Sequence, residues 1–217
     1  HRWVRGDWQL LPWLFPRVPH AGAGKRPNPL SALDRWKIVD NLLRSLQAPI
    51  LLALLVAGWF WLPGPAWGWT LVGLTLSAMP WLTGVAGKWL HWLRRPTLGV
   101  QTSALWTQFS RWLLEIVFLP YQAVLMVDAI SSTLVRLTLT RQHLLQWTTA
   151  AHTVRLFGKA RQVGLIWRRM WSAPLIAVGL GGLMLAFNPS ALLLAAPLLL
   201  VWLVSPQVAL WISRPVT

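Results

Sequence analysis

Two long stretches without charge dominate the hydropathy pattern of this chain. Residues 46–87 and residues 170–213 contain no Asp, Glu, Lys or Arg. Each stretch is about twice as long as the roughly 20 residues that one helical bilayer crossing needs. Each is also interrupted near its middle by a turn signal, Pro63-Gly64-Pro65 in the first and Asn188-Pro189-Ser190 in the second. The pattern therefore predicts two transmembrane hairpins, with spans near 46–62 and 66–87 and near 171–187 and 191–211.

The segment before the first hairpin divides into two parts. Residues 1–29 contain repeated Pro and Gly, which exclude a long helix, and residues 20–26 are interpreted as a flexible loop. Residues 30–45 have helical spacing of apolar positions and a polar side with Arg and Lys. They predict an amphipathic helix at the membrane surface, with Ser31 as N-cap and Asp34 completing an imperfect capping box.

The segment 88–169 is predicted to be cytoplasmic and interfacial. Within it, Gln108, Arg111, Glu115 and Gln122 recur on one helical face, so residues 109–140 are predicted to lie on the membrane as a helix and not to form a fifth crossing. Two ion pairs are expected along this segment, Glu115 with Arg111 and Asp128 with Arg136, and the alternative is that both acids face lipid headgroups. The predicted fold is therefore an all-α membrane protein with four transmembrane helices in two hairpins, plus cytoplasmic interfacial amphipathic helices.

Composition and charge support this organisation. The 217 residues are 55% hydrophobic and 12% charged, whereas a soluble domain has about a quarter of its residues charged. The 20 Lys and Arg against 5 Asp and Glu all lie outside the two hairpins. By the positive-inside rule, the hairpin tips are extracytoplasmic, and both chain ends, including residues 214–217, are cytoplasmic. Nucleic-acid binding is disfavoured, because the basic residues are not gathered on one soluble face.

Four indoles surround the first hairpin turn, at Trp59, Trp61, Trp67 and Trp69. An interfacial aromatic belt is the commoner explanation for such a cluster, and a sugar-stacking platform is the alternative. Elsewhere the sequence offers little catalytic chemistry. No histidine pair has metal-ligand spacing, no Cys is present, and five acidic residues leave little material for paired-carboxylate catalysis.

The opening stretch His1-Arg2-Trp3-Val4-Arg5-Gly6-Asp7-Trp8-Gln9 is the strongest candidate site. Arg2 and Arg5 can hold a diphosphate through planar bidentate hydrogen bonds, and Trp3 and Trp8 offer faces for sugar stacking. Gly6 permits close backbone approach, while Asp7 can accept hydroxyl hydrogen bonds or hold one arginine in place. An interfacial Arg/Trp cluster that anchors lipid headgroups explains the same residues, and the physics of the stretch leaves both interpretations open.

The same nonapeptide resembles the end of the glycosyltransferase domain of bacterial cyclic β-1,2-glucan synthases. Its Arg2-Trp3 is similar to the last two residues of the QxxRW motif of processive transferases. Further similarity lies, in the family's order, in Asn28-Pro29-Leu30-Ser31 through Asp40-Asn41-Leu42, in Phe118 to Ala123 and in Trp147 to Ala151. His152 departs from the acidic residue expected after the last of these.

The resemblance implies a large, multi-pass enzyme of the bacterial inner membrane that transfers glucose from UDP-glucose to a growing β-1,2-glucan, which is later cyclised. Arg2 would stabilise the diphosphate leaving group and Trp3 would contact the acceptor, with Arg5, Asp7, Trp8 and Gln9 binding substrate. A divalent metal, Mg or Mn, would be bound upstream of His1, so we expect this fragment to be inactive alone. Its partners would be the bilayer, the nucleotide sugar, the glucan and the remaining domains. The alternative is a non-catalytic membrane scaffold or transporter subunit whose basic clusters bind lipid.

Overall fold

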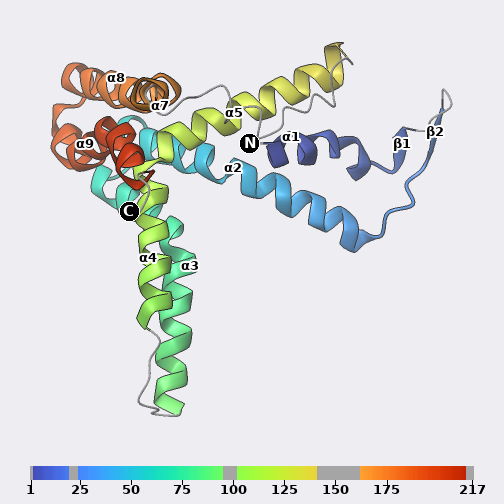
Figure 1. Ribbon diagram of the computed structural model, residues 1–217, viewed down its shortest axis with the longest axis horizontal. Helices are drawn as coiled ribbons and strands as arrows, with labels where there is room; N and C mark the ends of the chain where they lie inside the picture. The colour runs from blue at the N-terminus through green and yellow to red at the C-terminus, as the bar shows by residue number, and fades with distance from the viewer. Residues whose placement is uncertain (1, 20–23, 95–101, 141–161, 214–217) are drawn as a thin grey trace. The chain divides into compact units, whose positions relative to one another are not determined.

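The computed structural model describes residues 2–19, 24–94, 102–140 and 162–213, and this part of the chain is almost entirely α-helical (Figure 1). The helices are α1 (Arg2–Gln9), α2 (Ala32–Phe60), α3 (Ala66–Arg94), α4 (Thr102–Val117), α5 (Leu119–Val135), α7 (Gln162–Met170), α8 (Ser172–Phe187) and α9 (Pro189–Ile212). A 3-10 turn η1 (Leu11–Leu14), a π-helical turn η2 (Arg136–Thr140) and two short strands, β1 (Arg17–Pro19) and β2 (Lys25–Pro27), complete them. The predicted all-α fold is confirmed.

The chain forms two compact units, which are described separately. The first comprises His1–Ile50 and Gln122–Gln162, and the second comprises Leu51–Tyr121 and Val163–Thr217. The expected Trp147–Ala151 motif and His152 lie outside the described residues. Helices α2 and α5 each contribute to both units.

The N-terminal segment of the first unit is built around Asn28. Its side-chain Nδ2 donates to the carbonyls of Trp13 (2.6 Å) and Phe15 (2.9 Å), and its Oδ1 accepts from the backbone N–H of Leu30 (2.9 Å). Asn28 thereby links η1 to the start of α2. Strands β1 and β2 pair antiparallel, with Val18 opposite Arg26. Lys25 and Arg26, predicted to lie in a flexible loop, are therefore in a strand, while residues 20–23 of that loop are outside the described part.

The start of α2 follows the predicted cap. The Ser31 hydroxyl accepts from the backbone N–H of Asp34 (3.2 Å) and donates to its carboxylate (2.7 Å). The predicted surface helix 30–45 and the first span do not form separate elements, because α2 runs without interruption from Ala32 to Phe60. No Gly or Pro stands at the predicted boundary near residue 45, and Pro49 is accommodated within the helix.

The second unit joins the two predicted hairpins at their tips. The indole of Trp59, at the end of α2, donates to Thr70 Oγ1 of α3 (2.9 Å), and its ring lies 6.0 Å from that of Trp202 in α9. Asn188, which caps α9, donates from Nδ2 to the carbonyl of Trp59 (2.8 Å). Both tips therefore lie on the same side of this unit, as the positive-inside pattern requires.

Two glycines shape the first tip, one through close packing and one through its backbone conformation. A Cβ on Gly58 would lie 2.3 Å from Cβ of Trp69, so only glycine permits α2 and α3 to approach there. Gly64 has φ of 96°, a left-handed conformation that glycine adopts without strain, and it sits in the predicted Pro-Gly-Pro turn.

Helix lengths and composition identify four candidate membrane spans in the described residues. They are Ala32–Phe60, Ala66–Leu90, Leu119–Thr140 and Pro189–Ile212. In the second predicted hairpin, α8 qualifies as a candidate span only when it is taken together with Gly164–Met170. The two helical segments are bent by 51° relative to each other. The segment Leu119–Thr140, predicted to be interfacial, is long and apolar enough to cross. Its location on or across the membrane stays a prediction.

The segment predicted as one helix over 109–140 is broken at Phe118 into α4 and α5. The break has a local cause, because Pro120 has no N–H to donate to the carbonyl of Ile116, four residues earlier. The buried indole of Trp202 donates to that carbonyl instead (2.9 Å). One turn earlier, Trp112 donates to Ser77 Oγ of α3 (2.9 Å). Helix α4 therefore packs against α3, which runs alongside it in Figure 1, and also contacts α9.

Neither predicted ion pair of this segment is present as expected. Within the described residues, Glu115 forms no ion pair with Arg111. Asp128 pairs with Arg5 of helix α1 at 3.9 Å. Helical spacing in the sequence identifies neighbours along one helix. The partner of Asp128, however, is Arg5 on a different helix, α1.

Candidate functional site

The opening stretch forms the amphipathic helix α1, and one of its faces is buried. Val4 is completely buried against Ala129 and Ile130 of α5, and Trp8, one turn later, packs against the same cluster. Figure 1 shows α1 lying along both α2 and α5 within the first unit. Because residues four apart share a helix face, Val4 and Trp8 together fix the rotation of α1 about its axis.

A hydrogen bond holds the buried face in register with α2. The Trp8 indole Nε1 donates to Ser45 Oγ (2.9 Å), and the Ser45 hydroxyl in turn donates to the carbonyl of Leu42 (2.7 Å). Ser45 is 1% exposed, so this link is shielded from water. A typical intramolecular hydrogen bond contributes about 0.5–1.5 kcal/mol net.

Charged groups flank the buried face on both sides. Arg5 contacts Asp128 of α5 through Nη2 and Oδ2 at 3.9 Å, and Arg5 Nε is buried without a hydrogen-bond partner. Asp7 receives a side-chain hydrogen bond from Asn41 of α2. Partial burial raises the pKa of the Asp7 carboxyl above its ordinary value, and the hydrogen bond from Asn41 opposes this rise.

The opposite face of α1 is exposed and carries Arg2, Trp3 and Gly6. The Trp3 side chain is 51% exposed, and Arg2 forms no ion pair within the described residues. Gly6 follows Arg2 by one helical turn, and a Cβ at that position would meet nothing within 4 Å. Within the described residues, nothing therefore covers the Gly6 position on this face.

The structure thus separates the predicted site residues into two groups. Arg5, Asp7 and Trp8 contact the rest of the first unit, and Gln9 is half-buried with a partner in the chain. The contacts of Arg5, Asp7 and Trp8 help to orient the helix, and substrate binding by these residues and Gln9 stays a prediction. Arg2 and Trp3 are exposed within the described residues, and their contacts with a diphosphate and an acceptor stay predictions.

Three partners of α1 were not identified from the sequence as part of this site. Ser45, Asn41 and Asp128 hold Trp8, Asp7 and Arg5 respectively. Asn41 belongs to the Asp40-Asn41-Leu42 motif, which was noted for its resemblance alone. A small polar residue within an apolar helix face, such as Ser45, is the one signal that could have indicated a buried hydrogen-bond acceptor.

Metal binding was expected outside this chain. In the part of the chain that the structure describes, no group of three His, Cys, Asp or Glu side chains could hold a metal ion. The exposed face of α1 offers a cation, an aromatic ring and an open backbone surface. Such a face suits recognition of an anionic group next to a sugar.

Comparison with known proteins gives a match along nearly the whole chain. The chain is 36% identical, over 219 aligned residues, to the protein described as cyclic beta-(1,2)-glucan synthase NdvB of Rhizobium meliloti (strain 1021). The match covers 99% of this chain and 7% of the relative, so the chain spans a small part of the relative's length. No protein-family profile matches the chain. The identity confirms, for the segment that this chain represents, the resemblance to the cyclic β-1,2-glucan synthases that its motifs indicated.

Proposed function

We propose that this chain is the membrane region of a glucan synthase that transfers glucose from UDP-glucose to a growing β-1,2-glucan. The observation that carries the proposal is the exposed Arg2-Trp3 pair on a helix whose other face is locked by Val4 and Trp8. The similarity to a cyclic β-1,2-glucan synthase supports the substrate class. The metal and nucleotide ligands would come from other parts of the full-length protein.

In this proposal Arg2 stabilises the negative charge that develops on the diphosphate as the glycosidic bond forms. A guanidinium remains charged at all physiological pH values and binds phosphate oxygens through two parallel hydrogen bonds. Such charge stabilisation lowers the barrier only if the cation is positioned before the reaction. The anchoring of α1 by Ser45, Asn41 and Asp128 supplies that positioning.

Trp3 would contact the sugar ring at the acceptor end. It lies next to Arg2 on the exposed side of α1, so a sugar stacked on its indole would be adjacent to a diphosphate held by the guanidinium. The candidate spans and the exclusion of all Lys and Arg from the two charge-free stretches support a multi-pass protein with this face in the cytoplasm. From the similarity to the Rhizobium meliloti protein, we infer that the membrane is a bacterial inner membrane.

The test is Arg2→Ala in the full-length protein, with glucan formation from UDP-glucose measured in membranes. We expect a loss of at least about a hundredfold, the scale reported for removing one group that stabilises developing charge. Arg2→Lys retains the charge but not the bidentate geometry and should recover part of the activity. Arg26→Ala is the matched control, because Arg26 is an exposed arginine in β2, away from α1.

The alternative is a non-catalytic scaffold whose basic clusters bind lipid. It predicts that Arg2→Ala and Arg26→Ala have the same small effect on glucan formation and that both weaken binding to vesicles containing anionic lipid. Unchanged glucan yield in Arg2→Ala, with normal membrane insertion, would refute the leaving-group role.

A further inference from the structure

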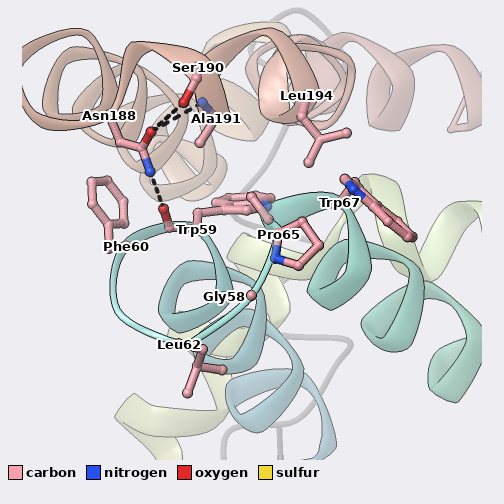
Figure 2. A pocket seen from close by; sticks show the side chains of 12 residues that line it. Gly58, Trp59, Phe60, Leu62, Pro65, Trp67, Asn188, Ser190, Ala191 and Leu194 are labelled. Atoms are coloured by element: carbon pink, nitrogen blue, oxygen red, sulfur yellow. Dashed lines mark hydrogen bonds between the residues drawn. The ribbon is translucent and has the colours of Figure 1, made fainter.

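The two hairpin tips of the second unit enclose a pocket that the proposed transfer reaction does not use. Its volume is about 430 Å³, within the range of small-molecule sites. Figure 2 shows Trp59 and Pro65 from the first tip facing Asn188 and Ser190 from the second, with Trp67 at the opposite end. Of the two tryptophans, Trp59 is buried and Trp67 is 57% exposed, so Trp67 offers an accessible aromatic surface.

The polar groups of this tip pocket are fixed by hydrogen bonds within the second tip. Asn188 Oδ1 accepts from Ser190 Oγ (2.8 Å) and from the backbone N–H of Ala191 (3.4 Å), as Figure 2 shows. Asn188 Nδ2 uses one N–H for the carbonyl of Trp59 (2.8 Å). An amide nitrogen has a second N–H, and the Ser190 oxygen, having donated its proton, retains lone pairs. The Trp67 indole makes no hydrogen bond within the described residues and adds another donor.

The chemistry of this lining selects for a neutral, hydroxyl-rich ligand. No charged side chain lines the tip pocket, so it has no cation to neutralise a phosphate and no carboxylate to bind a metal or an amine. Donors and acceptors occur together instead, beside aromatic and proline surfaces. Each sugar hydroxyl is both a donor and an acceptor, and the apolar face of a pyranose suits an aromatic ring.

An apolar groove adjoins the tip pocket and shares Phe60 and Asn188 with it. The groove has a volume of about 410 Å³ and is otherwise lined by Val56, Trp61, Leu180, Leu183 and Phe187. A glucosyl unit could therefore be presented to the tip pocket in two ways, as part of a free glucan or as the headgroup of a lipid whose chain occupies the groove.

We propose that the tip pocket binds an uncharged glucosyl unit, stacked on Trp67 and hydrogen-bonded to Asn188 and Ser190. This site is separate from the face of α1 that carries Arg2. Three of the four indoles around the first turn then have distinct roles. Trp59 and Trp69 form hydrogen bonds that build the tip, to Thr70 and to the carbonyl of Pro63, whereas Trp67 remains available for a ligand.

The experiment uses the full-length protein in lipid nanodiscs, without glycoside detergents. A photoreactive analogue of sophorose, the β-1,2-linked glucose disaccharide, is crosslinked, and the labelled peptides are identified by mass spectrometry. We expect labelling within residues 58–67 or 188–194 that unlabelled sophorose displaces. Trp67→Ala should weaken displacement by about tenfold, which corresponds to about 1.4 kcal/mol. Ser190→Ala should weaken it less, and Trp89→Ala, which alters an exposed indole of α3 away from the pocket, should not change it.

The competitors distinguish the sources of the ligand. Displacement by sophorose at lower concentrations than octyl glucoside assigns the site to free glucan, whereas displacement by octyl glucoside at lower concentrations than sophorose assigns it to a lipid-borne glucosyl unit. Both results support the proposal. Equal labelling of Trp67→Ala and the unaltered protein, or displacement by UDP or inorganic phosphate, would overturn it. Arg2→Ala should leave this labelling intact, so failure of the proposed transferase role and failure of the pocket proposal give different results.

Discussion

The hydrogen bond between Trp202 and the α4–α5 break allows a quantitative test of how the second unit is stabilised. Trp202→Phe removes the indole N–H that satisfies the Ile116 carbonyl while retaining an aromatic ring. Trp202 is 0% exposed, and Pro120 cannot supply the N–H that a regular helix would provide. The substitution therefore leaves a buried carbonyl without a partner.

Two terms contribute to the expected loss of stability. An unsatisfied buried acceptor costs about 1–3 kcal/mol. The smaller Phe ring also leaves space beside Trp59, whose ring centroid lies 6.0 Å from that of Trp202. The destabilisation from this packing defect adds to that from the lost hydrogen bond. We therefore expect Trp202→Phe to lower the free energy of unfolding by about 2–4 kcal/mol.

A double-mutant cycle with Pro120→Ala separates the two terms. Alanine at position 120 restores an N–H that can bond the Ile116 carbonyl, so in that background Trp202→Phe should cost only its packing term. The penalty of Trp202→Phe should therefore fall by about 1–2 kcal/mol when Pro120 is replaced. The assay is urea unfolding in detergent micelles, followed by far-ultraviolet circular dichroism.

Trp211→Phe is the control for this cycle, since Trp211 is an exposed indole in the same helix α9. It should change the free energy of unfolding by less than about 0.5 kcal/mol. If Trp202→Phe had the same penalty with Pro120 and with Ala at position 120, the proposed replacement of the missing N–H by the indole would be wrong.

Two further predictions concern the support of α1. Ser45→Ala removes the acceptor of the Trp8 indole N–H and should lower the free energy of unfolding of the first unit by about 1 kcal/mol. It should also reduce glucan formation by the full-length protein. Unaffected glucan formation would refute the role of Ser45 in positioning α1. Asp7→Asn should raise the free energy of unfolding at neutral pH by less than about 1 kcal/mol, because burial raises the pKa of Asp7 and its ionised form is therefore disfavoured in the folded state. This advantage should shrink as pH falls through the raised pKa and vanish below the ordinary value near 3.8; an advantage that grew with acidity, in paired urea titrations, would contradict it.

The candidate site shows how far local pattern can lead. The nonapeptide identified Arg2 and Trp3 by residue type and by resemblance, and the structure leaves both exposed. The same pattern predicted Arg5, Asp7 and Trp8 as substrate ligands, which stays a prediction, and the structure adds their contacts with Asp128, Asn41 and Ser45. A sequence shows which groups can bind a phosphate or a sugar, but not which of them are already engaged by a distant helix.

The sequence by itself determined the helical class, the two turn-centred hairpins and the exclusion of charge from residues 46–87 and 170–213. These features follow from local rules, because an apolar run of a given length and a Pro-Gly or Asn-Pro turn act within a few residues. Tertiary structure alone decided the continuity of α2, the partner of Asp128 and the pocket between the hairpin tips. It also decided that the indole of Trp202 donates to the Ile116 carbonyl, to which Pro120 cannot donate. Trp202 follows Pro120 by 82 positions in the chain (202 − 120). Hydrogen bonds and packing of this kind join residues that no periodicity relates, so they arise only when the helices are assembled.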